Sequence, residues 1–212
     1  MESYVSVIAD QVLVMLLLMA AGFFSYKVKI ISNEGSKQIT NILILLVSPV
    51  VIFVSYQRDF DPEMLKGLAQ AFGIALLGFA IAMAGAYLLL RAKGKEGKAA
   101  LAVERFSVIY SNCGFIGIPL VQALFGNEGV FYLTAVMTAF NILVWTHGLF
   151  LFTGGEKFSI KGLLKALCSP SILAVPIGLI CFLLRLRVPD VVLDAMNYIA
   201  GMNTPLAAFF KT

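Results

Sequence analysis

One part of this chain has residue types and spacing that could do chemistry: Ser111-Asn112-Cys113-Gly114-Phe115-Ile116-Gly117-Ile118-Pro119-Leu120. It lies in an apolar stretch of membrane-spanning length, yet it holds two glycines, a proline and an uncharged amide. Irregular backbone inside a bilayer is tolerated only where protein buries it or where it lines a cavity. Secondary transporters use such broken helices to hold substrates near the bilayer midplane. The stretch therefore predicts a carrier.

The residue types in this break suit an anionic ligand. Pro119 has no N–H, and Gly114 and Gly117 allow unusual backbone angles. Because proline is favoured at the first position of a helix, Ile118 or Pro119 is expected to begin a second half-helix. Its free N–H groups would face the gap and attract a carboxylate, and Asn112 adds an uncharged amide. The alternative is a proline kink with glycines for close helix packing.

A second polar feature is the pair of hydroxyl–proline dipeptides, Ser48-Pro49 and Thr204-Pro205. A hydroxyl before proline can satisfy a carbonyl that the kink frees, which is a structural role. Asn203 makes the second site more polar than a hinge requires, so Asn203 and Thr204 are also candidates for substrate binding. The expected hinge or crossover residues are Ser48, Pro49, Pro119 and Pro205.

Ionisable residues in the apolar segments are few. Asp10 in the first segment and His147 in the fifth are the candidates for coupling, since a proton-coupled carrier needs a titratable group inside the membrane. The alternative for each is a position near a membrane interface. The three cysteines match no metal spacing, and no nucleophile–base pair, HExxH, GxSxG or phosphate loop occurs. The sequence predicts neither an enzyme nor a metal site.

Composition identifies the elements that must position these residues. Hydrophobic residues make up 60% of the chain and charged ones 13%, whereas a soluble domain has about 25% charged residues. Long continuous apolar runs predict an all-α polytopic membrane protein rather than a barrel. The expected spanning segments are Val5–Tyr26, Ile39–Tyr56, Leu65–Leu90, Phe106–Phe125, Val130–Thr153, Leu167–Leu186 and Val191–Phe210.

Charges in the connections predict the topology. The first, third and fifth connections hold eleven Lys and Arg residues, and the second, fourth and sixth hold four. The positive-inside rule then places the odd connections in the cytoplasm and the N-terminus outside. The expected location is the cell membrane, plasma or inner, as a multi-pass protein.

The chain also contains a partial internal repeat at an offset of 156 residues. Gly22 matches Gly178, Asn41 matches Asn197, Pro49 matches Pro205, Phe53 matches Phe209, and Lys29 corresponds to Arg185. Five segments separate the two copies, so their membrane orientations are opposite, as in inverted-repeat transporters. The alternative is chance similarity between two apolar stretches. The predicted division is 1–155 for a first five-helix repeat and 156–212 for the start of a second. Two complete copies of about 156 residues would need a longer chain than these 212 residues, so the chain is expected to be truncated.

The motif at the break resembles that of the auxin efflux carrier family, which includes bacterial malate- and malonate-type permeases and the plant PIN carriers. In this chain it comprises Asn112, Gly117-Ile118-Pro119-Leu120 and Phe125-Gly126. The resemblance implies ten segments in two inverted repeats, of which about seven are present here. It also implies that the fourth and ninth segments are broken and cross beside a carboxylate substrate. Asn112 would contact the substrate, and Pro119 would be the crossover proline.

These inferences predict a secondary transporter of small organic anions, carboxylates like auxin, malate or malonate, that works by alternating access. The expected partners are the lipid bilayer and a small carboxylate, with a homodimer as one assembly and no nucleic acid. No cofactor is expected, and either proton or sodium coupling fits. Alternatives are a non-transporting fragment or interaction subunit of a membrane complex, and a carrier of the bile-acid/sodium symporter type.

Overall fold

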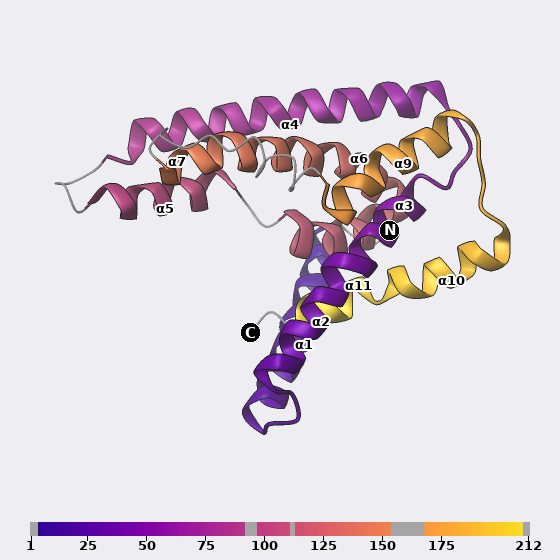
Figure 1. The fold of residues 1–212 in the computed structure, drawn as a ribbon, viewed down its shortest axis with the longest axis horizontal. Helices are drawn as coiled ribbons and strands as arrows, with labels where there is room; N and C mark the ends of the chain where they lie inside the picture. The colour runs from indigo at the N-terminus through magenta and orange to yellow at the C-terminus, as the bar shows by residue number, and fades with distance from the viewer. Residues whose placement is uncertain (1–3, 92–96, 111–112, 154–167, 210–212) are drawn as a thin grey trace. The chain divides into compact units, whose positions relative to one another are not determined.

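The computed structural model describes residues 4–91, 97–110, 113–153 and 168–209, and the regular structure in these ranges is all helical (Figure 1). In chain order the elements, where η marks a π-helical turn, are α1 (Tyr4–Lys27), α2 (Asn33–Ile42), η1 (Leu43–Val47), α3 (Ser48–Ser55), α4 (Pro62–Leu89), α5 (Gly97–Ile109), η2 (Cys113–Gly117), α6 (Ile118–Leu143), η3 (Val144–Gly148), α7 (Leu149–Thr153), α9 (Pro170–Leu183), α10 (Asp190–Gly201) and α11 (Asn203–Phe209).

Among the described residues, four helical stretches are long and apolar enough to cross a membrane: Val5–Lys27, Asn33–Ser55, Pro62–Leu89 and Ile118–Phe152. The helix α9 is a shorter apolar one. Large apolar side chains are exposed along α1 and α4, which suits a surface solvated by lipid rather than water. The chain is therefore an all-α polytopic membrane protein, as its composition predicts.

The structure agrees with the boundary that the sequence places between Phe125 and Val130. The element α6 consists of two helices that meet at a kink at Gly126. Gly126 has φ 61° and ψ −154°, a backbone conformation that glycine adopts easily and other residues resist. A bend at one residue redirects the helix without a loop of unbonded backbone groups, which lipid would penalise.

The chain forms two compact units. The first contains residues 1–61, 113–134 and 170–212, and the second contains 62–112 and 135–169. The helix α6 belongs to the first unit up to Thr134 and to the second from Ala135. These units are defined by contacts, whereas the predicted repeats are defined by sequence, so the division into 1–155 and 156–212 stays a prediction.

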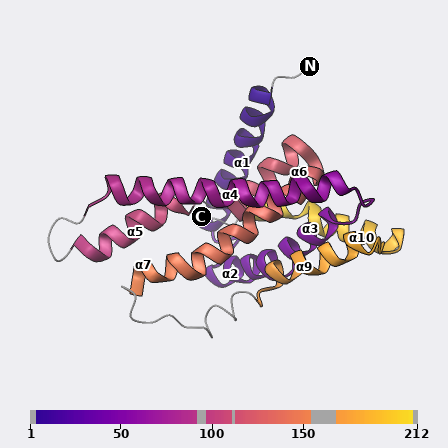
Figure 2. The ribbon, with the colours of Figure 1, turned by 90° about the horizontal axis from the view of Figure 1, so that it is seen from above.

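Helices of the first unit pack in a reciprocal pattern. Within this unit α1 packs against α11, and α3 packs against α9 (Figures 1 and 2). The 156-residue offset pairs α1 with α9, and α3 with α11. Each copy of the predicted repeat thus places its first helix on the second helix of the other copy.

The contact between α3 and α9 requires a glycine. A Cβ atom at Gly178 would lie 2.6 Å from Cδ2 of Tyr56, which is too close for any side chain. The Tyr56 ring is held in place because its hydroxyl shares a hydrogen bond with that of Thr134 and its edge packs on Phe131. Phe182 packs on Phe131 from α9, so this buried aromatic group joins three parts of the unit.

The first helices of the two copies also end in the same way. Lys29 and Arg185 both have positive φ, 63° and 57°. The N–H of Lys29 bonds to the carbonyl of Tyr26, and the N–H of Ile30 to that of Ser25. After α9, Arg185 bonds to Phe182 and Leu186 to Cys181, which is the same pattern 156 residues later. Two Schellman caps at one register support the alignment of the repeat.

The second unit contains α4, α5, the end of α6 from Ala135, η3 and α7, and α5 packs against both α4 and α7 (Figure 1). Its core is built on Ala86, Ile109 and Tyr110. Aromatic rings from several helices surround Tyr110, including Phe79, Phe106 and Phe140. This core fixes Tyr110 at the point where α5 ends, just before Ser111-Asn112.

Candidate substrate-binding site

The predicted break at Asn112–Pro119 is described from Cys113 onward. The helix α5 ends at Ile109, and helical structure resumes with η2 and α6. Ser111 and Asn112 lie outside the described residues. The expectation that Ile118 or Pro119 begins a helix is confirmed for α6, which starts at Ile118, but η2 precedes it without interruption.

This π-helical turn changes where free backbone donors lie. The first turn of a helix has no intrahelical partners for its N–H groups. Because η2 and α6 are continuous, the first turn lies in η2, which contains Gly114 and Gly117, rather than at Pro119 as the sequence suggests. Ile118 and Pro119 are buried.

Pro49 follows a similar turn. In both places the π-helical turn ends two residues before a proline, at Val47 and at Gly117. Ser48 donates its N–H to the carbonyl of Leu43, five residues back instead of four. A wider turn accommodates a residue that has no N–H and whose ring would clash with the carbonyl of the preceding turn. Ser48 and Pro49 therefore lie in a continuous helix. The irregular feature at this predicted hinge is the π-helical turn η1 just before them.

Pro205 lies in a different local structure. The helix α10 ends at Gly201, and Met202 closes it with a bond from its N–H to the carbonyl of Ile199. The next helix, α11, starts at Asn203. The predicted hinge at Pro205 is thus an interruption between two helices.

Asn203 is the most informative residue of this break. Its side chain is 2% exposed, and its Nδ2 atom has no hydrogen-bond partner among the residues that the structure describes. A buried amide left without a partner costs about 1–3 kcal/mol. The helix α11 packs against η2, so Asn203 and half-buried Thr204 belong to the element beside the fourth-segment break. The first unit thereby brings together the two features that the sequence singles out separately.

The coupling candidates lie in different units. Asp10 is exposed on α1 in the first unit. His147 lies in η3 of the second unit, between two tyrosines: its Nδ1 is 2.8 Å from the Tyr110 hydroxyl and its Nε2 is 3.2 Å from the Tyr87 hydroxyl.

The hydrogen bonds around His147 suit one tautomer of the neutral ring. The Tyr110 hydroxyl lies 3.0 Å from the carbonyl of Leu143, which can only accept. When Tyr110 donates its proton there, Nδ1 of His147 donates to Tyr110 and Nε2 accepts the hydroxyl proton of Tyr87. Arg105 of α5 lies over the Tyr87 ring, 4.0 Å from its centroid, and donates to the carbonyl of Leu90 at 2.9 Å. The result is a hydrogen-bonded chain, Tyr87–His147–Tyr110, beside a cation.

Comparison with known sequences identifies the class of protein. Residues 7–210 match the family described as membrane transport protein, which is the auxin efflux carrier family that the break resembles. The chain belongs to this family. It is 26% identical over 203 residues to an uncharacterized transporter of Methanocaldococcus jannaschii, and equally to one of Methanothermobacter thermautotrophicus. These alignments cover 93% of the chain, which spans 65% and 64% of the length of those two relatives.

In this member of the transport family, the described site residues divide between the units. Gly114, Gly117, Ile118, Pro119, Asn203 and Thr204 lie in the first unit, as do Ser48, Pro49, Pro205 and Asp10, whereas His147 lies in the second. The sequence reasoning missed Tyr87 and Tyr110. Tyr110 could have been identified from the sequence, because it carries a hydroxyl in an apolar segment and directly precedes Ser111-Asn112.

Proposed function

We propose that this chain forms part of a secondary transporter that moves small organic anions across the membrane by alternating access. The substrates would be carboxylates of the auxin, malate or malonate kind. Membership of a transport family supports the carrier role. The unpartnered amide of Asn203 supports the substrate class, because Nδ2 is a hydrogen-bond donor and a carboxylate offers only acceptors.

Donors of two origins meet in the proposed site. Nδ2 of Asn203 is one, and backbone N–H groups in the first turn of η2 would be the other, since α11 and η2 are in contact. In this proposal Asn112, which directly precedes η2, adds a second amide, and Gly114 and Gly117 let the substrate approach the backbone. Uncharged donors hold a carboxylate without placing a permanent charge in the membrane, which would be costly when the substrate leaves. Thr204 supplies a hydroxyl next to Asn203.

Replacing the amide of Asn203 by an apolar group of similar shape tests the proposal. Loss of one hydrogen bond to a charged group costs about 1.5–3 kcal/mol, so Asn203→Val is expected to weaken transport roughly tenfold to a hundredfold. The measurement is uptake of labelled malonate and malate by proteoliposomes that contain the protein. Asn197→Ala, an exposed amide removed from the neighbouring α10, is the matched control and retains wild-type uptake. Wild-type uptake by Asn203→Val would remove this residue from the substrate site.

We also propose that transport is coupled to protons at His147 rather than at Asp10 or through sodium. Asp10 is exposed on the surface of α1, whereas His147 lies in a hydrogen-bonded chain that ends two residues before Asn112. Protonation puts a second N–H on the ring, so Tyr87 can no longer donate to Nε2 and its hydroxyl must turn. The groups that sense this change are Tyr87 of α4, Tyr110 after α5, and Arg105, whose guanidinium lies over Tyr87.

The pH profile of uptake tests this coupling. Histidine is the side chain whose charge ordinarily changes between about pH 5 and 8, so wild-type uptake should vary across that range, whereas His147→Gln should have a flat profile. Asp10→Asn keeps the wild-type profile. Replacing external sodium by potassium should leave wild-type uptake unchanged. A wild-type profile in His147→Gln would place the coupling elsewhere.

A further inference from the structure

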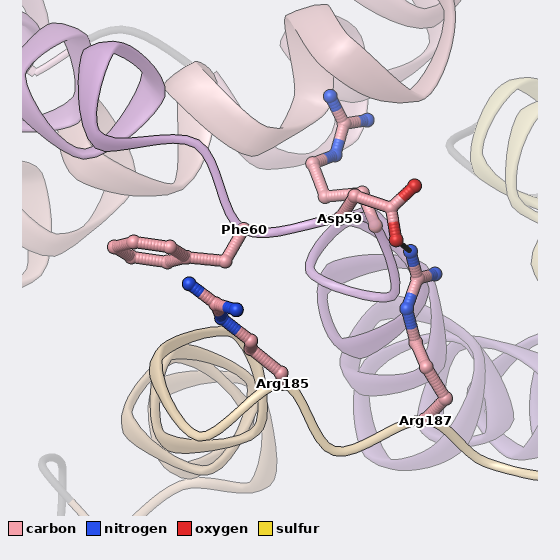
Figure 3. Close-up of a pocket in the computed structure, with 5 residues that line it drawn as sticks. Asp59, Phe60, Arg185 and Arg187 are labelled. Carbon is pink, nitrogen blue, oxygen red and sulfur yellow. Dashed lines mark hydrogen bonds and ion pairs between the residues drawn. The ribbon is translucent and has the colours of Figure 1, made fainter.

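A cavity lies at one end of the first unit, away from the break, where the connections after α3 and α9 meet. Its volume is about 220 Å³, and Arg58, Asp59, Phe60, Arg185 and Arg187 line it (Figure 3). Two contacts fasten the connections to each other. The N–H of Val188 donates to Oε1 of Gln57 at 3.0 Å, and Arg187 bonds to Asp59 at 2.8 Å.

The lining carries more positive than negative charge. Asp59 is the one carboxylate of the lining, and Arg187 pairs with it, as Figure 3 shows. Within the described residues, neither Arg58 nor Arg185 forms an ion pair. Burial lowers the pKa of the Arg58 guanidinium, and the more distant charge of Glu128 on α6 raises it in part. Two guanidinium groups at this cavity are therefore without a contacting anion.

Both guanidinium groups are held in fixed positions. Arg58 is half-buried, donates from Nε to the carbonyl of Ser55 at 2.9 Å, and lies 5.3 Å from the centroid of the Phe131 ring. Arg185 lies 5.4 Å from the centroid of Phe60, and the two side chains face each other in Figure 3. A guanidinium that is already stacked on an aromatic ring loses less entropy when it binds an oxyanion.

The cap at the end of α9 positions the Arg185 side chain. The φ of Arg185, 57°, matches that of Lys29, 63°, in the equivalent cap of the repeat, but of these two residues only Arg185 lies at this cavity.

We propose that this cavity binds an oxyanion, a carboxylate or phosphate group, between Arg58 and Arg185, with an apolar part of the ligand against Phe60. The volume is below the roughly 300–1,000 Å³ of sites for drug-sized ligands, so the occupant is a small anion or a single lipid headgroup. The cavity is separate from Asn203, and the inference does not depend on transport. The topology predicted from charge places both connections on the outer face.

Equilibrium binding tests this site without transport. Malonate and inorganic phosphate are titrated at constant ionic strength into the protein purified in neutral detergent, and calorimetry gives the Kd. The Asn203→Val background removes binding at the proposed transport site. Arg185→Gly removes the guanidinium and relieves the backbone, so it should fold at least as well as the parent and bind about tenfold more weakly, as expected for one lost charge-assisted hydrogen bond.

The repeat supplies a matched control. Lys29→Gly makes the same change in the equivalent cap, where it also removes a positive charge, and should leave the Kd unchanged. Arg58→Gln should weaken binding as Arg185→Gly does. Nanodiscs with and without anionic lipid distinguish a lipid headgroup from a free anion as the natural ligand. If a lipid headgroup occupies the cavity, anionic lipid raises the apparent Kd for malonate in the parent but not in Arg185→Gly. If the ligand is a free anion, the Kd is the same in both membranes. Unchanged affinity in Arg185→Gly, or equal weakening in Lys29→Gly, would overturn the proposal.

Discussion

The two copies of the predicted repeat differ at the buried position before their hydroxyl–proline dipeptides. Val47 precedes Ser48-Pro49, and Asn203 stands at the same register before Thr204-Pro205. Both side chains are buried, with 0% and 2% exposure. Because an apolar side chain fills this position in the first copy, burial here does not by itself require an amide. A binding role for Asn203, as proposed above, would account for the difference.

The helices around Val47 and Asn203 also differ in their continuity. In the first copy, η1 and α3 carry the backbone past Pro49 as one continuous helix. In the second, the helix stops at Gly201 and restarts at Asn203. At this position one copy has a buried apolar side chain in a continuous helix, and the other has a buried amide at the start of a helix. Similar sequence patterns have produced a supporting element and a candidate binding element.

The largest effect on stability is expected when the first copy is made to resemble the second. Val47→Asn buries an amide where no partner is prepared for it, which should lower the free energy of unfolding by about 2–3 kcal/mol. Chemical unfolding of the purified protein in detergent, followed by circular dichroism, measures this loss. A stability equal to that of the wild type would mean that the position around Val47 already contains a polar partner.

The reciprocal change is the control for this comparison. Asn203→Val removes an unpartnered donor, so it should leave the free energy of unfolding unchanged or raise it by about 1 kcal/mol, even though transport falls. If Asn203→Val were as destabilising as Val47→Asn, the amide would be structural, and the two copies would differ in folding rather than in function.

The smallest expected effects test whether the copies share one backbone design. Lys29→Gly and Arg185→Gly should each raise the free energy of unfolding by about 0.5–1 kcal/mol, because relief of positive φ outweighs the extra entropy of glycine in the unfolded chain. Lys27→Gly, inside the last turn of α1, is the control and should lower it by about 1 kcal/mol. If one of these two glycine variants were more stable than the wild type and the other less stable, the shared register of the two caps would be contradicted.

The sequence predicts well what depends on local composition. Apolar runs identify the helices, and the glycines with Pro119 identify the break, because both follow from backbone chemistry within a few residues. The kink at Gly126 lies within the boundary predicted between Phe125 and Val130, because glycine adopts its positive φ easily. The buried, unpartnered state of Asn203 depends on helices far away in sequence. The Tyr87–His147 bond and the cavity at Arg58 and Arg185 likewise join residues 60 or more apart.

The reciprocal packing of α1 on α11 and of α3 on α9 has a consequence for biosynthesis. Translation delivers α1 to the membrane first, but its partner α11 is almost the whole chain away. Until the ribosome has made that later segment, the face of α1 that α11 covers must be solvated by lipid or by a chaperone. Contacts of such long sequence separation form slowly. The first copy therefore cannot complete its own packing, and final assembly of the first unit waits until the second copy has been inserted.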